Sequence, residues 1–419
     1  MDLQTICNLI DERQDELYSL LSTLVKMNSE NNGITGNEEE CARYIHKLCL
    51  EYGFESDLYS PLELEGFDKH PDYLPGRHLD NRYNVTAKWK GMEDKNEVML
   101  MGHTDTVEFG DLANWEKHPL SGEISDGKIY GRGATDDKYA IALSIFLMKL
   151  LKDAGFQPKA NLLMTAYVDE ELGGSHGAMA AVMKHPTKRI VNIDGIPNML
   201  INYATGGGVV VYRFHTKDTV DSAELTASGF PVVMEELKKF GERRRTELEQ
   251  NPGYKGTTIP EGALRYNEIR AGDNDMDKDI GILKFTYYTD QPKEVIGKEF
   301  EELAKSISDR LAPMGLVGDG FSPDTRFFHY GVCPPDCEDV QLMQEASKEI
   351  TGKELLVCGG GLSDLSALIK HGSEFAYVIG AGRMFCEQGG AHQPNEFIEC
   401  DKLLELTKMV AAYLLKVLG

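Results

Sequence analysis

The spacing of hydrophobic positions in the first half of the chain alternates between helical and strand-like periods. Apolar residues recur at helical spacing over residues 1–28, and a second helix is predicted over 37–52 with Asn37 as its cap. The other elements predicted here are the strands 83–90, 98–102, 161–168 and 189–193 and the helices 138–154 and 173–183. Strands that alternate with helices indicate an α/β domain whose sheet is covered on both faces.

The pattern changes after Gly206-Gly207-Gly208 and returns near Tyr330. The elements predicted in between are a strand 209–215, a helix 223–246, strands 263–270 and 281–289 and a helix 291–311. Those predicted afterwards are helices 338–351, 364–371 and 400–418 and strands 354–358 and 375–379. The simplest organisation is therefore one α/β domain formed by residues 1–206 and 331–419, with an inserted α+β domain of residues 207–330.

Composition narrows the class of protein. A chain of 419 residues exceeds one ordinary hydrophobic core, and 41% hydrophobic with 27% charged residues is globular composition. The net charge of −24 argues against nucleic acid as a partner, and no apolar stretch approaches the ~20 residues needed to cross a membrane. An acidic chain fits ordinary solubility as well as a site that gathers carboxylates around cations.

Location follows from the chain's start and its cysteines. Residues 1–4 contain neither a basic nor an apolar region typical of an export signal, and eight cysteines follow no disulfide framework. We therefore expect reduced thiols and a cytoplasmic protein.

Potential metal ligands follow several of the predicted strands. His103 comes directly after strand 98–102, and a carboxylate two residues on, Asp105, can hydrogen-bond the second imidazole nitrogen. Asp136 and Asp137 stand in a glycine-rich loop before a helix. Their carboxylates either stabilise the N-terminus of that helix or bind a cation. Taken singly, each motif fits a solvated loop as well as a site.

A run of acids and two isolated residues extend this set. Asp169, Glu170 and Glu171 follow strand 161–168, and three consecutive acids repel one another unless cations or basic groups neutralise them. Asp194 follows strand 189–193, and His392 precedes the last helix.

Five of these side chains together form a plausible ligand set. Zinc prefers histidine and carboxylate ligands, and two ions about 3.5–4 Å apart need a bridging carboxylate. The proposed ligands are His103, Asp136, Glu171, Asp194 and His392. The expected cofactor is a pair of divalent ions, zinc first, with cobalt or manganese as alternatives.

The ordered motifs resemble a known family. The series His-x-Asp, Gly-Arg-Gly-x-x-Asp-x-Lys, Glu-Glu, a later Asp and His-x-Pro-x-Glu resembles the metallopeptidases and deacylases that include acetylornithine deacetylase, succinyl-diaminopimelate desuccinylase, aminoacylase, carnosinase and carboxypeptidase G. The resemblance implies a three-layer α/β catalytic domain with a mixed sheet. It also implies that residues 207–330 form an α+β lid or dimerisation domain, which makes a homodimer the expected assembly.

The resemblance also implies a role for each ligand. Asp136 would bridge both ions, His103 and Asp194 would complete one, and Glu171 and His392 the other. Two further residues would act beside them. Asp105 would orient His103, and Glu170 would be the general base that takes a proton from the metal-bridging water and passes it to the leaving amine.

The inserted domain departs from the family pattern at one position. The family's lid histidine is expected near Asp218, whereas His215 lies within the first strand, where a structural role is favoured. His329 and His176 are the alternatives for that role.

Other substrate contacts and one catalytic-domain position also differ. In other family members, a strand of this domain often carries an arginine for the substrate carboxylate. The corresponding strand of this chain has no arginine, and Arg270 lies nearby in sequence. Ser363, in a glycine-rich segment close to the family pattern, completes the substrate-binding candidates with His215 and Arg270. Tyr139 replaces the glycine usual after the lysine.

The predicted function is hydrolysis of an amide bond in a small substrate. An N-acyl amino acid is the first choice and a dipeptide the second. A metal-bound protein without hydrolytic activity is the alternative of another class, but such a protein needs no base like Glu170. Cys333 and Cys337 are interpreted as structural, because two cysteines do not complete a tetrahedral zinc site.

Overall fold

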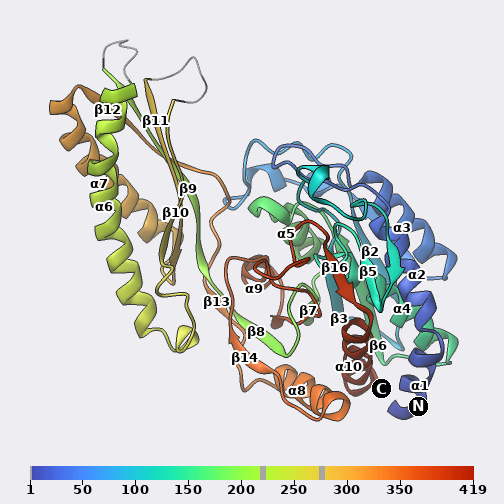
Figure 1. The fold of residues 1–419 in the computed structure, drawn as a ribbon. Coiled ribbons are helices and arrows are strands. Elements are labelled where there is room, and N and C mark those ends of the chain that lie inside the picture. The colour runs from blue at the N-terminus through green and yellow to red at the C-terminus, as the bar shows by residue number, and fades with distance from the viewer. Residues whose placement is uncertain (1, 218–222, 273–278) are drawn as a thin grey trace. The chain divides into compact units, whose positions relative to one another are not determined.

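The computed structural model describes residues 2–217, 223–272 and 279–419, which form two compact units (Figure 1). The first unit comprises Met1–Asn202, Val332–Cys358 and Ala367–Gly419. The second comprises Tyr203–Gly331 and Gly359–Ser366. The short segment Gly359–Ser366 lies in the range expected for the α/β domain, yet it groups with the second unit.

A nine-stranded mixed sheet forms the centre of the first unit. Its strands, in spatial order, are β1 (Glu55–Tyr59), β2 (Asn84–Trp89), β6 (Ala160–Tyr167), β3 (Glu93–His103), β7 (Arg189–Asn192), β15 (Phe375–Val378), β8 (Met199–Ala204) and β13 (Gly331–Val332), and β14 (Leu356–Gly359) also pairs with β8. The four central strands β6, β3, β7 and β15 lie side by side in this order and run parallel to one another. Their carboxyl ends therefore meet at one edge, where α/β proteins place their sites.

Helices cover both faces of this sheet. On one face lie α1 (Leu3–Glu12), α2 (Gln14–Val25), α3 (Glu39–Glu51), α4 (Lys138–Asp153), α8 (Glu338–Thr351) and α10 (Cys400–Leu418), whose apolar residues share one large cluster. On the other face lie α5 (His176–Lys184) and α9 (Leu365–His371), which contribute to a smaller cluster. The expected three-layer α/β fold with a mixed sheet is confirmed.

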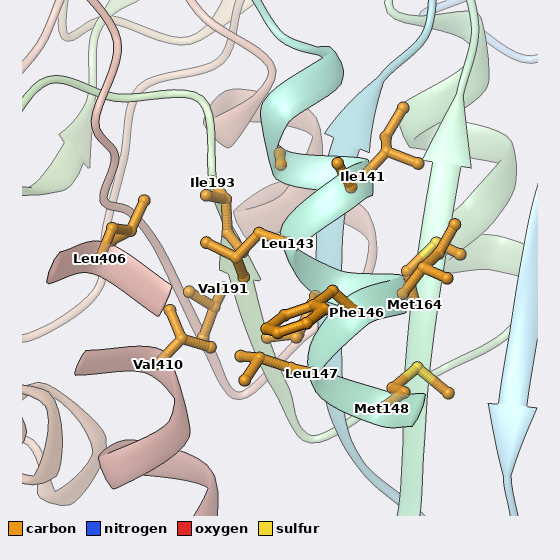
Figure 2. Packing of buried hydrophobic residues seen from close by; sticks show 14 of the residues in the cluster. Ile141, Leu143, Phe146, Leu147, Met148, Met164, Val191, Ile193, Leu406 and Val410 are labelled. Carbon is orange, nitrogen blue, oxygen red and sulfur yellow. The ribbon is translucent and has the colours of Figure 1, made fainter. Parts of the chain in front are cut away.

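Helix α4 is the most buried helix in this unit, and its surroundings explain its sequence. Almost every side chain from Lys138 to Leu151 is buried, so apolar residues occupy all sides of the helix. Phe146 and Leu147 face Val191 of β7 and Val410 of α10 (Figure 2). The helix is therefore enclosed between the sheet and the last helix, and its first turn is fixed at the carboxyl edge of the sheet.

The second unit is an antiparallel sheet with helices on one face, as expected for the inserted α+β domain. Its strands, in spatial order, are β10 (Leu264–Ala271), β11 (Ile280–Thr289), β9 (Gly206–Thr216) and β12 (Leu316–Pro323). Helices α6 (Ala223–Gln250) and α7 (Lys293–Leu311) share one apolar cluster with these strands.

Some elements differ from the sequence predictions. The helix expected over residues 1–28 is two helices that separate at Arg13. Helix α3 begins at Glu39, and Asn37 is not its cap; the preceding Glu38 is held by Arg82 instead. The strands that the pattern did not predict are β1, β8, β12, β13 and the small three-stranded sheet of β16 (Phe397–Glu399), β5 (Lys128–Tyr130) and β4 (Glu123–Ser125).

Within the described part of the chain, no helix is both long and apolar enough to cross a membrane.

Candidate metal centre

Histidine and carboxylate side chains converge at the carboxyl edge of the parallel strands in the first unit. His103 is the last residue of β3, and its Nε2 lies 3.0 Å from Asp136 Oδ1 and 4.0 Å from Asp194 Oδ1. Asp136 stands in the loop before α4, and Asp194 follows β7. The ring of His103 is fully buried, so its position is fixed by the surrounding protein.

A second histidine approaches the same aspartate from the other side. His392 Nε2 lies 3.3 Å from Asp136 Oδ2 and 2.8 Å from Glu171 Oε2. One oxygen of Asp136 therefore faces His103 and the other faces His392. This arrangement divides the five predicted ligands into two groups that share a single carboxylate.

The donor atoms fit a pair of divalent cations. Ligand atoms of His103, Asp136 and Glu171 all lie within 4.8 Å of one another, and so do those of His103, Asp137 and Asp194. Two imidazoles among carboxylates are a donor set typical of zinc and related divalent ions.

Asp137 is a member of this cluster that the ligand prediction left out. Its Oδ2 accepts a hydrogen bond from the main-chain N–H of His103 at 3.3 Å. Its Oδ1 is buried and has no hydrogen-bond partner among the described residues. Burial raises the pKa of Asp137 well above its usual value, and the neighbouring charge of Asp194 raises it further. The paired carboxylates at 136–137 were the only sequence signal for it.

The electrostatics of the cluster favour positive charge. Burial lowers the pKa of His392, but hydrogen bonds to Asp136 and Glu171 outweigh it and raise that pKa to about 10. Burial raises the pKa of Glu171, and the neighbouring Asp136 raises it further. Buried carboxylates at this density require a compensating cation, which protonated histidines or metal ions supply.

The carboxylate of Asp105 holds the turn that carries two acids. Its Oδ1 accepts the N–H of Glu170 at 3.1 Å, and its Oδ2 accepts the N–H of Glu171 at 3.0 Å. Asn31 Nδ2 donates to the same Oδ2 at 2.8 Å. His103 Nδ1 lies 2.9 Å from the main-chain oxygen of Asp105 and 3.7 Å from its carboxylate. Asp105 thus contacts the His103 ring through its backbone oxygen, whereas its carboxylate accepts both N–H groups of the Glu170–Glu171 turn.

Asp169 anchors the same turn from inside the protein. It has a φ of 61°, and its carboxylate accepts hydrogen bonds from Arg82 Nη1 at 2.9 Å and contacts His176 Nδ1 at 2.6 Å. Arg82 is fully buried and also binds Glu38, with its Nε 2.8 Å from Oε1. His176, one alternative for the lid histidine, is therefore engaged within the first unit.

Glu396 ties the glycine-rich loop to the segment that carries His392. Its Oε2 lies 2.6 Å from Arg132 Nη1, and its Oε1 accepts the N–H groups of Gly133 and Thr135 at 2.9 and 3.0 Å. The Gly-Arg-Gly motif and the late His-x-Pro-x-Glu motif, more than 250 residues apart, are thus one structural unit. This contact fixes Asp136 and His392 relative to each other.

The predicted substrate contacts all lie in the second unit. His215 is on β9, with its Nδ1 2.9 Å from Asp319 Oδ1. Arg270 is on β10, with its Nε 2.9 Å from Glu268 Oε1, and β11 separates the two strands. Ser363 belongs to the short segment Gly359–Ser366. Their roles toward a substrate stay predictions.

Three other sequence positions can be placed. The main-chain N–H of His329 donates to Ser366 Oγ at 2.6 Å. Asp218, by contrast, lies outside the described residues. The Sγ atoms of Cys333 and Cys337 lie 3.8 Å apart, and neither belongs to a three-ligand group among the described residues.

Comparison with known proteins assigns the family. The profile of the Peptidase family M20/M25/M40 matches residues 99–416. The chain belongs to this family. M20 proteins are metal-dependent hydrolases that act on amide or peptide bonds, so the predicted class of enzyme and its family are confirmed.

Three of the similar proteins match nearly the whole chain at low sequence identity. An uncharacterised metallohydrolase of Methanocaldococcus jannaschii is 25% identical, with 94% of this chain and 98% of the relative covered. N-formyl-4-amino-5-aminomethyl-2-methylpyrimidine deformylase of Halalkalibacterium halodurans is 23% identical, with 97% and 95% covered. The crystal structure of human carnosine dipeptidase 1 has a TM-score of 0.70 at 15% identity, with 99% of each chain covered. At that identity the likeness shows a shared fold.

Proposed function

We propose that this M20 hydrolase removes the acyl group from an N-acyl amino acid. It uses two divalent ions, for which zinc is the first choice. The observation that carries the proposal is the position of Asp136, with one carboxylate oxygen toward His103 and the other toward His392. Glu170, a carboxylate that the ligand set does not require, stands next to Glu171 in the same turn.

The ligands divide between the two ions as the contacts suggest. His103 and Asp194 would hold one ion, Glu171 and His392 the other, and Asp136 both. When bound, the two ions supply Lewis acidity, which lowers the pKa of water toward ~7 and polarises the scissile carbonyl.

Glu170 is proposed to move the proton. Its backbone is fixed by the carboxylate of Asp105, and its side chain is partly exposed, so it can meet a substrate. Its carboxylate accepts a proton from the attacking water and returns it to the departing amine nitrogen, which leaves as a neutral amine. Because the same carboxylate takes up and delivers the proton, no second residue is needed as the general acid.

A test of this role separates catalysis from metal binding. Glu170→Ala is expected to retain both ions, measured by elemental analysis, and to lose turnover by at least the ~100-fold typical of a general base. Glu224→Ala, at the start of α6, serves as the matched surface control. Unchanged turnover in Glu170→Ala would remove Glu170 from the mechanism, and loss of metal would make it a ligand.

The substrate class is tested by a direct comparison. N-formyl, N-acetyl and N-succinyl amino acids are compared with dipeptides, each with added zinc, cobalt or manganese, and released amine is measured. The deformylase among the relatives supports the acyl substrates. The proposal expects a higher kcat/KM for an N-acyl amino acid. Higher values for dipeptides would establish the dipeptidase alternative, and turnover of neither class would refute both substrate assignments.

Assembly and location remain part of the proposal. We expect a cytoplasmic homodimer formed through the second unit, where β10 is an edge strand with exposed side chains. Light scattering measures the assembly: a monomer at micromolar concentration would contradict it.

A further inference from the structure

The hydroxyl of Tyr139 lies in the core and contacts the turn that carries Asp194. Tyr139 is the second residue of α4 and is fully buried. Its hydroxyl donates a hydrogen bond to the main-chain oxygen of Gly195 at 3.2 Å and accepts one from the N–H of Ala381 at 3.2 Å. Gly195 follows the proposed ligand Asp194. A single phenol therefore connects α4 to two loops from distant parts of the sequence.

The two loops lie against each other without intervening side chains. A Cβ on Gly195 would meet the carbonyl carbon of Ile379 at 2.8 Å, and one on Gly380 would meet the oxygen of Gly195 at 2.0 Å. The N–H of Gly382 also donates to the oxygen of Gly195 at 2.9 Å. The Gly195 oxygen therefore accepts two hydrogen bonds, one from the main-chain N–H of Gly382 and one from the Tyr139 hydroxyl.

The same segment continues to the loop that carries Asp136. The N–H of Arg383 donates to Thr135 Oγ1 at 2.8 Å, and Thr135 immediately precedes Asp136. Ile193, just before Asp194, lies in the apolar core with α4 (Figure 2). The Asp194 turn is thus held by the packing of an apolar side chain, Ile193, and by the hydrogen bond from the phenol.

We propose that Tyr139 is a positioning residue of the metal centre: its hydroxyl fixes the Asp194–Gly195 turn and so holds the Asp194 carboxylate beside His103. The inference rests on the ligand assignment proposed above. Burial raises the pKa of Tyr139 well above its usual value, so the hydroxyl keeps its proton and remains a donor. A glycine at this position would leave the N–H of Ala381 without this acceptor.

Tyr139→Phe tests the hydroxyl alone, because phenylalanine keeps the ring that fills the core. Apoprotein prepared with a chelator is titrated with Zn²⁺ by calorimetry. Wild type is expected to bind two ions. In Tyr139→Phe, one ion should keep its wild-type affinity, and the Kd of the other should rise about tenfold, the effect of one buried hydrogen bond.

Tyr413→Phe is the matched control. Tyr413 is also fully buried, and its hydroxyl donates to Asp339 Oδ1 at 2.8 Å, away from the metal cluster. This variant should lose thermal stability and keep both zinc affinities. Should the apoprotein of Tyr139→Phe not fold, the zinc-loaded variant is challenged with a chelator, and one of its two ions should leave about tenfold faster than from wild type.

The outcomes separate the two proposals. Two wild-type affinities in Tyr139→Phe, or an equal loss at both ions, would overturn the positioning role while leaving the metal centre intact. Failure of the wild-type protein to bind two ions would instead overturn the ligand assignment.

Discussion

Asp105→Asn distinguishes the two functions that the structure gives to this residue. The backbone oxygen that contacts His103 is unchanged by the substitution, whereas the carboxylate that accepts the N–H groups of Glu170 and Glu171 is replaced. An amide has one acceptor oxygen, so one of the two N–H groups then faces an NH₂ group. The turn that carries the proposed base should lose its fixed position.

The magnitude follows from the lost hydrogen bond. A hydrogen bond to a charged group contributes roughly 1.5–3 kcal/mol, which corresponds to about a 10- to 150-fold change in rate if it acts fully on the transition state. We expect kcat/KM at saturating zinc to fall by that factor. Orientation of His103 should persist, because its Nδ1 contact at 2.9 Å uses the backbone.

The assay measures kcat/KM and zinc stoichiometry on the same preparation. Asp111→Asn is the matched control, because exposed Asp111 caps a short helix at Ala113, a task that asparagine performs equally well. A decrease below about twofold in Asp105→Asn, less than a single neutral hydrogen bond provides, would refute the assigned role of the carboxylate.

Two predictions concern stability. Arg82→Met leaves Glu38 and Asp169 buried without their shared cation, so the free energy of unfolding in urea should fall by about 3–5 kcal/mol; a loss as small as that of the exposed control Arg43→Met would contradict the network. In the second unit, burial raises the pKa of Glu247 to about 7, above its value in the unfolded chain. The stability contributed by the protonated Glu247 carboxyl is therefore fully present below about pH 4.5 and is lost as the pH rises through 7. Glu247→Gln should unfold at a higher temperature than wild type at pH 8 and at the same temperature at pH 4. Equal gains in unfolding temperature at both pH values would contradict the raised pKa.

Local pattern was sufficient for most elements. Helix α4 and strand β6 agree with their predicted ranges within a residue or two, because continuous apolar runs bounded by polar turns leave few alternatives. Strands β1 and β12 were missed, since short or glycine-containing edge strands take their conformation from a partner rather than from an apolar period. The break at Arg13 was also invisible, because the apolar spacing continues across it.

The residue types of the metal cluster could be predicted without the structure. His103, Asp194 and the Asp169–Glu171 run each follow an apolar strand, and parallel strands bring such positions to one edge. The contacts that support these residues could not be predicted in this way. The carboxylate of Asp105 contacts main-chain groups 65 residues away, and Tyr139 reaches Ala381 across 242 residues. Periodicity reports on neighbours along the chain, whereas these hydrogen bonds exist only after folding has brought distant backbone groups together.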